Sequence, residues 1–197
     1  MKAGVNFNPS TPKEHFLKLL GSKGVQIPNK VNHKMYKTDD KAYNKLSCRI
    51  PRQFDAREKW RHCNTIGEVL DQGNCGSCWA LATSSAFADR LCVDTNGDFN
   101  ELLSAEEITF CCHSYSCGNG CNGGYPIRAW KRFKTHGLVT EGNYKSGEDC
   151  KPYRVPPCPC VEQGNHTCAG PPPSELNNNC TEKCDGNLDL DFDQDHR

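Results

Sequence analysis

The sequence lacks long hydrophobic runs, and this limits the classes to which the protein can belong. No stretch of about 20 apolar residues, the length of a transmembrane helix, occurs among the 197 residues. No apolar run follows Met1 either, so the printed sequence contains no secretory signal. Only 36% of the residues are hydrophobic and the mean hydropathy is −0.75. We therefore expect no membrane partner, and only a modest core from packing alone.

The sequence also lacks net charge, although its charges are unevenly distributed. Residues 1–50 carry +7, residues 51–184 carry −3 and residues 185–197 carry −4. The basic N-terminal segment has no aromatic interleaving and no dense basic run, so it does not predict a nucleic-acid partner. A basic leader that rests on its own mildly acidic body is the simpler interpretation.

Cysteine, in contrast, is abundant, with 15 in the chain. This density indicates either a disulfide framework or several zinc sites. Zinc sites favour cysteine pairs at regular separation, whereas these are irregular and include the vicinal pair Cys111-Cys112. Two sequons, which begin at Asn165 and Asn179, predict glycans and favour passage through an oxidising compartment. Disulfides are therefore favoured over zinc, and we expect no metal and no cofactor.

The composition changes near residue 49. Before it, a capping box at Thr11–Glu14, with Pro12 at the first helical position, predicts a short helix that Gly21 ends. Such a short helix is unstable alone and must dock on something. Residues 22–49 are polar and predict an extended linker. From Ile50 onward glycine, tryptophan and cysteine become frequent, so we place a boundary near residue 49.

Three helices are expected after this boundary. The first starts at Ser77 or Cys78 and runs to about Cys92, because its apolar residues recur at helical spacing. A capping box at Ser104–Glu107 opens the second, which ends near Cys111. The third spans residues 126–136, with a glycine as terminator. The acidic run at residues 189–195 lacks the residues of a calcium loop and is expected to be solvated.

The stretch from Gln72 to Ala80 carries the clearest chemical signal. Cys78 is predicted at a helix N-terminus, where the dipole and free N–H groups lower a thiol's pKa and can receive an oxyanion. Gln72 lies six residues earlier in a glycine-bracketed turn and offers an amide donor. This combination favours acyl transfer. Two alternatives stay open: Cys75–Cys78 is also a two-cysteine redox motif, and both cysteines could serve only as structural bridges.

Several separate motifs occur along the chain: Lys2–Phe7, Phe54–Arg57, Asp71–Gly73, Cys75–Trp79, Cys111-Cys112, Cys121–Pro126, Cys150–Tyr153 and Pro156–Cys158. In order and spacing they are similar to those of the papain family of cysteine proteases, and within it to cathepsin B. The resemblance implies an α+β, papain-like fold. The chain would hold mainly its helical, disulfide-rich left domain, with the β-rich right domain largely missing.

The resemblance also implies a domain organisation. Residues 1–49 would be a partial propeptide that crosses the cleft in the non-productive direction and blocks it until removal. Residues 50–197 would be the N-terminal part of the peptidase domain, with a cathepsin B-type inserted loop at about residues 156–170.

Roles follow from the resemblance for particular residues. Cys78 would be the nucleophile and Gln72 the oxyanion donor. Gly123 and Gly124 would form a backbone rail for extended substrate, and Tyr125 and Pro126 would border the second specificity pocket. Cys48, Cys78 and Cys160 would remain outside the implied disulfides, which are Cys63–Cys92, Cys75–Cys121, Cys111–Cys180, Cys112–Cys117, Cys150–Cys184 and Cys158–Cys168.

Two features depart from the family pattern. Only 119 residues follow Cys78, whereas the catalytic histidine and asparagine are expected roughly 130–150 residues after the cysteine. We therefore expect the chain to stop before them and to be inactive alone. In addition, Pro159, Cys160 and Val161 stand where cathepsin B carries two histidines that bind a substrate's C-terminal carboxylate. Endopeptidase action is accordingly favoured over dipeptidyl-carboxypeptidase action.

The implied function is that of a cysteine-type endopeptidase, made as a zymogen and active in lysosomal or digestive proteolysis. Its partners would be peptide substrates and its own propeptide, and it would act as a monomer in the lysosome or outside the cell. Two alternatives come from other classes: a non-catalytic binding or decoy remnant, and a thiol–disulfide oxidoreductase.

Overall fold

The computed structural model describes residues 12–23, 53–112, 117–158 and 179–197, and all structural statements concern these. Regular structure in this part of the chain consists of helices, and three isolated β-bridges join Ser22 to Gly124, Leu103 to Thr140 and Gly118 to Gly124. The elements are α1 (Lys13–Leu19), α3 (Ala56–Lys59), η2 (Asn64–Gly67), α4 (Cys78–Asp94), α5 (Ala105–Cys111), η3 (Gly120–Asn122), α6 (Pro126–His136) and α7 (Phe192–Asp195).

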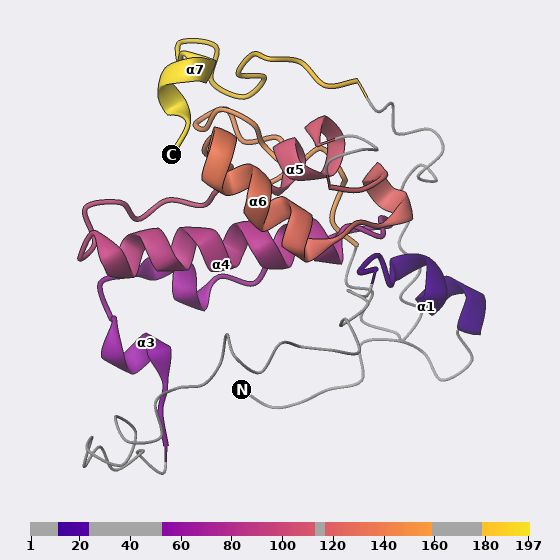
Figure 1. Ribbon diagram of the computed structural model, residues 1–197, viewed down its shortest axis with the longest axis horizontal. Helices are drawn as coiled ribbons and strands as arrows, with labels where there is room; N and C mark the ends of the chain where they lie inside the picture. The colour runs from indigo at the N-terminus through magenta and orange to yellow at the C-terminus, as the bar shows by residue number, and fades with distance from the viewer. Residues whose placement is uncertain (1–11, 24–52, 113–116, 159–178) are drawn as a thin grey trace, which may run out of the picture.

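Helix α4 is the centre of the fold. It contacts η2, α5 and α6, and Figure 1 shows α5 and α6 on one side of it, with α3 near its C-terminal end and α1 near its N-terminal end. The main core forms where these helices meet around Trp79, Phe133 and Leu138, all buried. None of the described helices is long and apolar enough to cross a membrane.

The three helices expected after the boundary near residue 49 are confirmed as α4, α5 and α6. Helix α4 starts at Cys78 and runs two residues beyond Cys92, because Thr95 closes its end by donating its N–H to Leu91 O. Helix α6 has the predicted bounds, and Gly137 ends it at φ +71°, a conformation that favours glycine.

The predicted capping box of α5 forms only in part, and that of α1 has no counterpart among the described residues. In α5, Ser104 Oγ accepts from Glu107 N, but the Glu107 carboxylate turns away from the cap and accepts from Val139 N at 3.1 Å. The α1 helix begins one residue later than predicted, at Lys13, because Pro12 is extended (ψ 140°) and occupies the N-cap position without a side-chain hydrogen bond.

Five disulfides hold the described cysteines together. Cys158 is also disulfide-bonded, but its implied partner Cys168 lies outside the described residues, as do Cys48 and Cys160. The five bridges join the pairs that the family resemblance implied: Cys63–Cys92, Cys75–Cys121, Cys111–Cys180, Cys112–Cys117 and Cys150–Cys184.

The C-terminal segment corrects the expectation of a solvated acidic run only at its end: Asp189, Asp191 and Asp193 are exposed, as expected. Asp195 is buried, and its carboxylate accepts from both the N–H and the hydroxyl of Thr140. Arg197 and Leu138 exchange backbone hydrogen bonds of 2.9 and 3.2 Å. The end of the run reaches the body after Asp191, whose side chain caps α7.

Candidate active site

A tight turn places Gln72 close to the start of α4. Gly73 has φ +59°, and its N–H donates to Asp71 Oδ1 at 2.8 Å. A Cβ at Gly73 would overlap the carbonyl oxygen of Pro156, so the turn packs directly against the chain beyond Tyr153. Glycine at this position therefore satisfies both the conformation and the close approach.

Cys78 occupies the first residue of α4 and is half-buried, and among the described cysteines it has the free thiol. Cys75 is bridged to Cys121, and Gly76 N donates to Cys121 O at 3.1 Å. These links tie the turn before Cys78 to η3. They also take Cys75 away from Cys78, so the two cysteines do not form the redox pair that one alternative required.

The Gln72 amide is held by two acceptors. Its Nε2 donates to Cys75 O at 2.7 Å and to Leu19 O at 3.0 Å. The first bond fixes the side chain against its own turn. The second is made with the leader, the N-terminal segment that contains α1. The Gln72 amide, which is proposed to donate to an oxyanion, therefore already donates to a peptide carbonyl of the leader.

One of the two glycines predicted as a substrate rail, Gly124, is hydrogen-bonded to the backbone of the leader. Gly124 N donates to Gly21 O and Lys23 N donates to Gly124 O, both at 2.9 Å, in a parallel bridge centred on Ser22. Gly123 has φ +94°, and a Cβ at Gly124 would lie 2.5 Å from the Trp79 ring. Only glycines allow this close backbone approach.

Tyr125 and Pro126 follow the rail directly. Both are half-buried, Pro126 begins α6, and the Arg128 guanidinium lies over the Tyr125 ring at 4.4 Å. The structure thus places the residues predicted to border a specificity pocket at the end of the rail, close in sequence to Gly124.

The histidines with described side chains make their contacts elsewhere. His136 bonds Thr135, the ring of His62 lies near Gly97, and His196 Nε2 lies 3.5 Å from Glu107 Oε1. His33, His113 and His166 lie outside the described residues, and so does the side chain of His15. No described side chain therefore supplies an imidazole to Cys78.

Several predicted positions fall outside the described residues: Asn165, Pro159, Cys160 and Val161. Asn179 is described and exposed, and its carbonyl accepts from Arg154.

Tyr153 is a site residue that sequence reasoning did not single out. Its hydroxyl lies 2.5 Å from Ser77 Oγ and donates to Gln72 O at 3.2 Å. Burial raises the pKa of Tyr153 far above its ordinary value, so the phenol keeps its proton. The motif Cys150–Tyr153 contributed to the resemblance, but no local pattern joined Tyr153 to a turn some 80 positions earlier.

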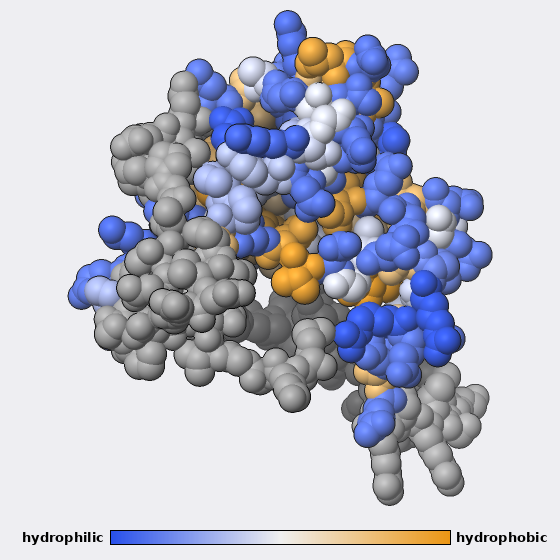
Figure 2. Space-filling view, turned by 180° about the vertical axis from the view of Figure 1, so that it is seen from behind, coloured by the Kyte–Doolittle hydropathy of each residue, from blue (hydrophilic) through white to orange (hydrophobic). Residues whose placement is uncertain are grey.

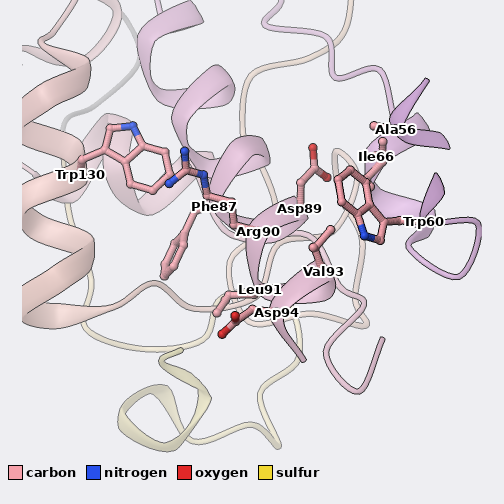
Figure 3. Close-up of a pocket in the computed structure, with 10 residues that line it drawn as sticks. All are labelled: Ala56, Trp60, Ile66, Phe87, Asp89, Arg90, Leu91, Val93, Asp94 and Trp130. Atoms are coloured by element: carbon pink, nitrogen blue, oxygen red, sulfur yellow. The ribbon is translucent and has the colours of Figure 1, made fainter. Parts of the chain in front are cut away.

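A hollow lies beside the C-terminal half of α4, and none of the predicted site residues lines it. It has a volume of about 720 Å³ and lies between α3, η2, α4 and α6. Figure 3 shows Trp130 and Arg90 at one side of it and Trp60 at the other, and the Arg90 guanidinium lies 5.1 Å from the Trp130 ring centroid. Elsewhere, the described surface in Figure 2 is mostly hydrophilic, with smaller hydrophobic areas between.

The family model of papain family cysteine proteases matches residues 50–189, and the chain belongs to this family. Its curated relatives include cathepsin B-like cysteine proteinases. It is 42% identical over 174 residues to cathepsin B-like cysteine proteinase 5 of Caenorhabditis elegans, covering 88% of this chain and 48% of that protein. It is 50% identical over 109 residues to proteinase 4 of the same organism, covering 55% and 32%.

A solved structure supports the fold. Procathepsin B S9 from Trypanosoma congolense matches with a TM-score of 0.60 and 25% identity, over 90% of this chain and 50% of that chain. The helical architecture is therefore papain-like. The chain spans about half the length of the cathepsin B-like proteinase 5 and of the procathepsin B that it matches.

Proposed function

We propose that a protein containing this chain is a cysteine endopeptidase that is made as a zymogen. The observation that carries the proposal is the state of the site around Cys78. A free thiol begins α4, and leader residues 19–23 hold both the Gln72 amide and the backbone of Gly124. Extended peptide would bind where the leader lies.

In the proposed reaction, the Cys78 thiolate attacks the carbonyl carbon of a peptide bond. The developing oxyanion would be stabilised by Gln72 Nε2 and by N–H groups at the start of α4. The C–N bond then breaks, and the amine leaves with a proton from an imidazolium. Water hydrolyses the thioester, returns a proton to the base and releases the carboxylate.

The base is proposed to lie outside these 197 residues. None of the seven histidines has flanking residues similar to those of the family's catalytic histidine. The 197-residue chain alone would therefore hydrolyse peptides poorly, because its thiol has neither a counter-ion nor a proton shuttle.

The leader is proposed to act as the inhibitory segment, with removal near residue 49. Its backbone contacts occupy the rail, and its positive charge complements the acidic body. Acidification would weaken this pairing by protonating carboxylates. The same proposal includes passage through the secretory route, with glycans at Asn165 and Asn179. The protein would then act as a monomer in the lysosome or outside the cell. A processing rate that does not change with pH would contradict the electrostatic part.

The test is peptide hydrolysis by the full-length gene product after leader removal, compared with its Cys78→Ala variant. We expect hydrolysis in the parent and a loss of at least about a thousandfold in the variant. Ser85→Ala, on the same helix, is the matched control and should retain activity. Peptide binding without hydrolysis in the parent would favour the decoy alternative, and insulin reduction that needs Cys75 and Cys78 would favour the oxidoreductase.

A further inference from the structure

The phenol of Tyr153 joins the two groups on which the proposed reaction depends. The side chain is 6% exposed and packs with Cys75, Leu81 and Val155 in a cluster beside the start of α4. Its hydroxyl contacts Ser77, which precedes the nucleophile, and the backbone of Gln72, the proposed oxyanion donor.

The direction of the hydrogen bonds follows from the protons available. A phenol has one proton, and Tyr153 donates it to Gln72 O at 3.2 Å. The 2.5 Å contact with Ser77 must then be a bond in which Ser77 Oγ donates to the Tyr153 oxygen. Ser77 is fully buried, so its hydroxyl is fixed by this bond instead of rotating freely.

This bond changes what Ser77 does for α4. A serine at the N-cap ordinarily accepts from an N–H of the first turn, as Ser104 Oγ does from Glu107 N at 3.0 Å in α5. Ser77 stands at the N-cap of α4 but makes no such bond. Ala80 N and Leu81 N already donate to Ser77 O. The N–H groups of Cys78 and Trp79, which have no partner within the helix, stay free of a side-chain cap.

The chain beyond Tyr153 supports the same turn. Val155 and Pro156 lie directly against Gly73, and Cys158 N donates to Asp71 Oδ2 at 3.0 Å. Tyr153 thus begins a segment that follows the turn carrying Gln72. A hydroxyl at this point fixes the turn and the start of α4 relative to one another.

We propose that Tyr153 is a positioning residue for the reaction at Cys78. It holds the Ser77 hydroxyl out of the capping position, so that the first N–H groups of α4 stay available to an oxyanion, and it fixes the backbone of Gln72. This inference rests on the proposed peptidase function. Tyr153 itself touches no reacting atom.

The experiment compares Tyr153→Phe with Tyr144→Phe in the full-length gene product after leader removal. Tyr144 is the matched control, because its side chain is exposed and its hydroxyl bonds neither Ser77 nor Gln72. We expect Tyr153→Phe to lower kcat about tenfold and to change KM less than about twofold, since only transition-state contacts weaken. Tyr144→Phe should change neither.

A second variant separates positioning from mere loss of stability. With Tyr153→Phe, the Ser77 hydroxyl is released and caps α4. Adding Ser77→Ala removes that cap and should recover a several-fold part of kcat, which a purely structural role does not predict. Equal kcat in Tyr153→Phe and Tyr144→Phe, a change confined to KM, or a further loss in the double variant would overturn the inference.

A parent protein that hydrolyses no peptide would refute the proposed function and leave a separate test of Tyr153. Alkylation of Cys78 by iodoacetamide at pH 6, mapped by peptide mass spectrometry, should be several-fold slower in Tyr153→Phe than in Tyr144→Phe, because a capped helix start stabilises the thiolate less. Equal rates in the two variants would overturn the inference by itself.

Discussion

Helices α4 and α5 are in contact, yet their N-termini are built in opposite ways. At α5 the first turn is closed: Glu107 N donates to Ser104 Oγ, and Glu106 N donates to the buried carboxylate of Glu141 at 2.9 Å. At α4 no side chain caps the helix and a free thiol begins it. A buried helix end without partners is costly unless a ligand or another group uses it.

The difference separates groups that stabilise the fold from the open helix end at which the reaction is proposed. The carboxylates around α5 are all engaged: Glu106 with Arg154, and Glu107 with Arg132, His196 and Val139 N. Near the open end of α4, the leader instead bonds the Gln72 amide and the backbone of Gly124.

The largest effect on stability is expected from Glu107→Ala. The side chain is fully buried, and its removal leaves Val139 N, Arg132 and His196 without their acceptor. Breaking such a buried pair costs about 3 kcal/mol. Chemical denaturation should show this loss, whereas the exposed control Glu148→Ala should unfold like the parent. A loss below about 1 kcal/mol would mean that the closed end of α5 is not a main support of the fold.

The second effect is a pH dependence that arises from Glu141. Burial raises the pKa of this carboxyl from 4.5 to about 8, so the folded state prefers it protonated. Its stabilising contribution is therefore complete below pH 4.5 and is lost as the pH rises through 8. Hydrogen bonding to Glu107 raises the pKa of His196 as well, which acts in the same direction.

We expect the melting temperature to be roughly 5 °C higher at pH 5 than at pH 8. Glu107 does not reverse this trend: although burial opposes it, hydrogen bonds from His196 and Arg132 lower its pKa, so it stays ionised in this range. Glu141→Gln should remove most of the difference. A melting temperature with the same pH dependence in parent and variant would contradict the assignment to Glu141.

The smallest effect compares the two N-cap serines directly. Ser104→Ala removes the cap of α5 and should cost about 1 kcal/mol. Ser77→Ala removes no cap, because its hydroxyl already bonds Tyr153, so the loss should be smaller. The denaturant midpoints of the two variants measure the two losses of stability. A larger loss in Ser77→Ala than in Ser104→Ala would contradict the absence of a cap at α4.

The sequence predicted the elements that local signals define. Caps, helical periodicity and terminating glycines placed α4, α5 and α6 within about two residues, because these signals lie inside the elements themselves. The short α3, η2 and η3 carry no such periodicity and were not predicted. The free thiol at the start of α4 was expected from its own flanks, whereas the disulfide pairs came from family resemblance alone.

Long-range contacts account for what local patterns missed. Tyr153 meets Ser77 across 76 positions, and Asp195 meets Thr140 across 55. No residue near Asp195 in the sequence indicates that its carboxylate bonds Thr140. The acidic run was therefore expected in solvent. A buried hydroxyl or carboxylate is assigned to its partner only when the fold brings the two together.

The alkylation rate of Cys78 by iodoacetamide, measured in the full-length gene product with its leader intact, shows directly whether the leader shields the start of α4. A Cβ on Gly21 would overlap the Gly76 carbonyl, whereas a Cβ on Gly67 meets nothing within 4 Å. Gly21→Ala should therefore loosen the leader, and Gly67→Ala is its matched control. The account predicts alkylation at least about tenfold faster in Gly21→Ala than in the parent and in Gly67→Ala. Equal rates in all three would contradict the claim that the leader covers the open end of α4.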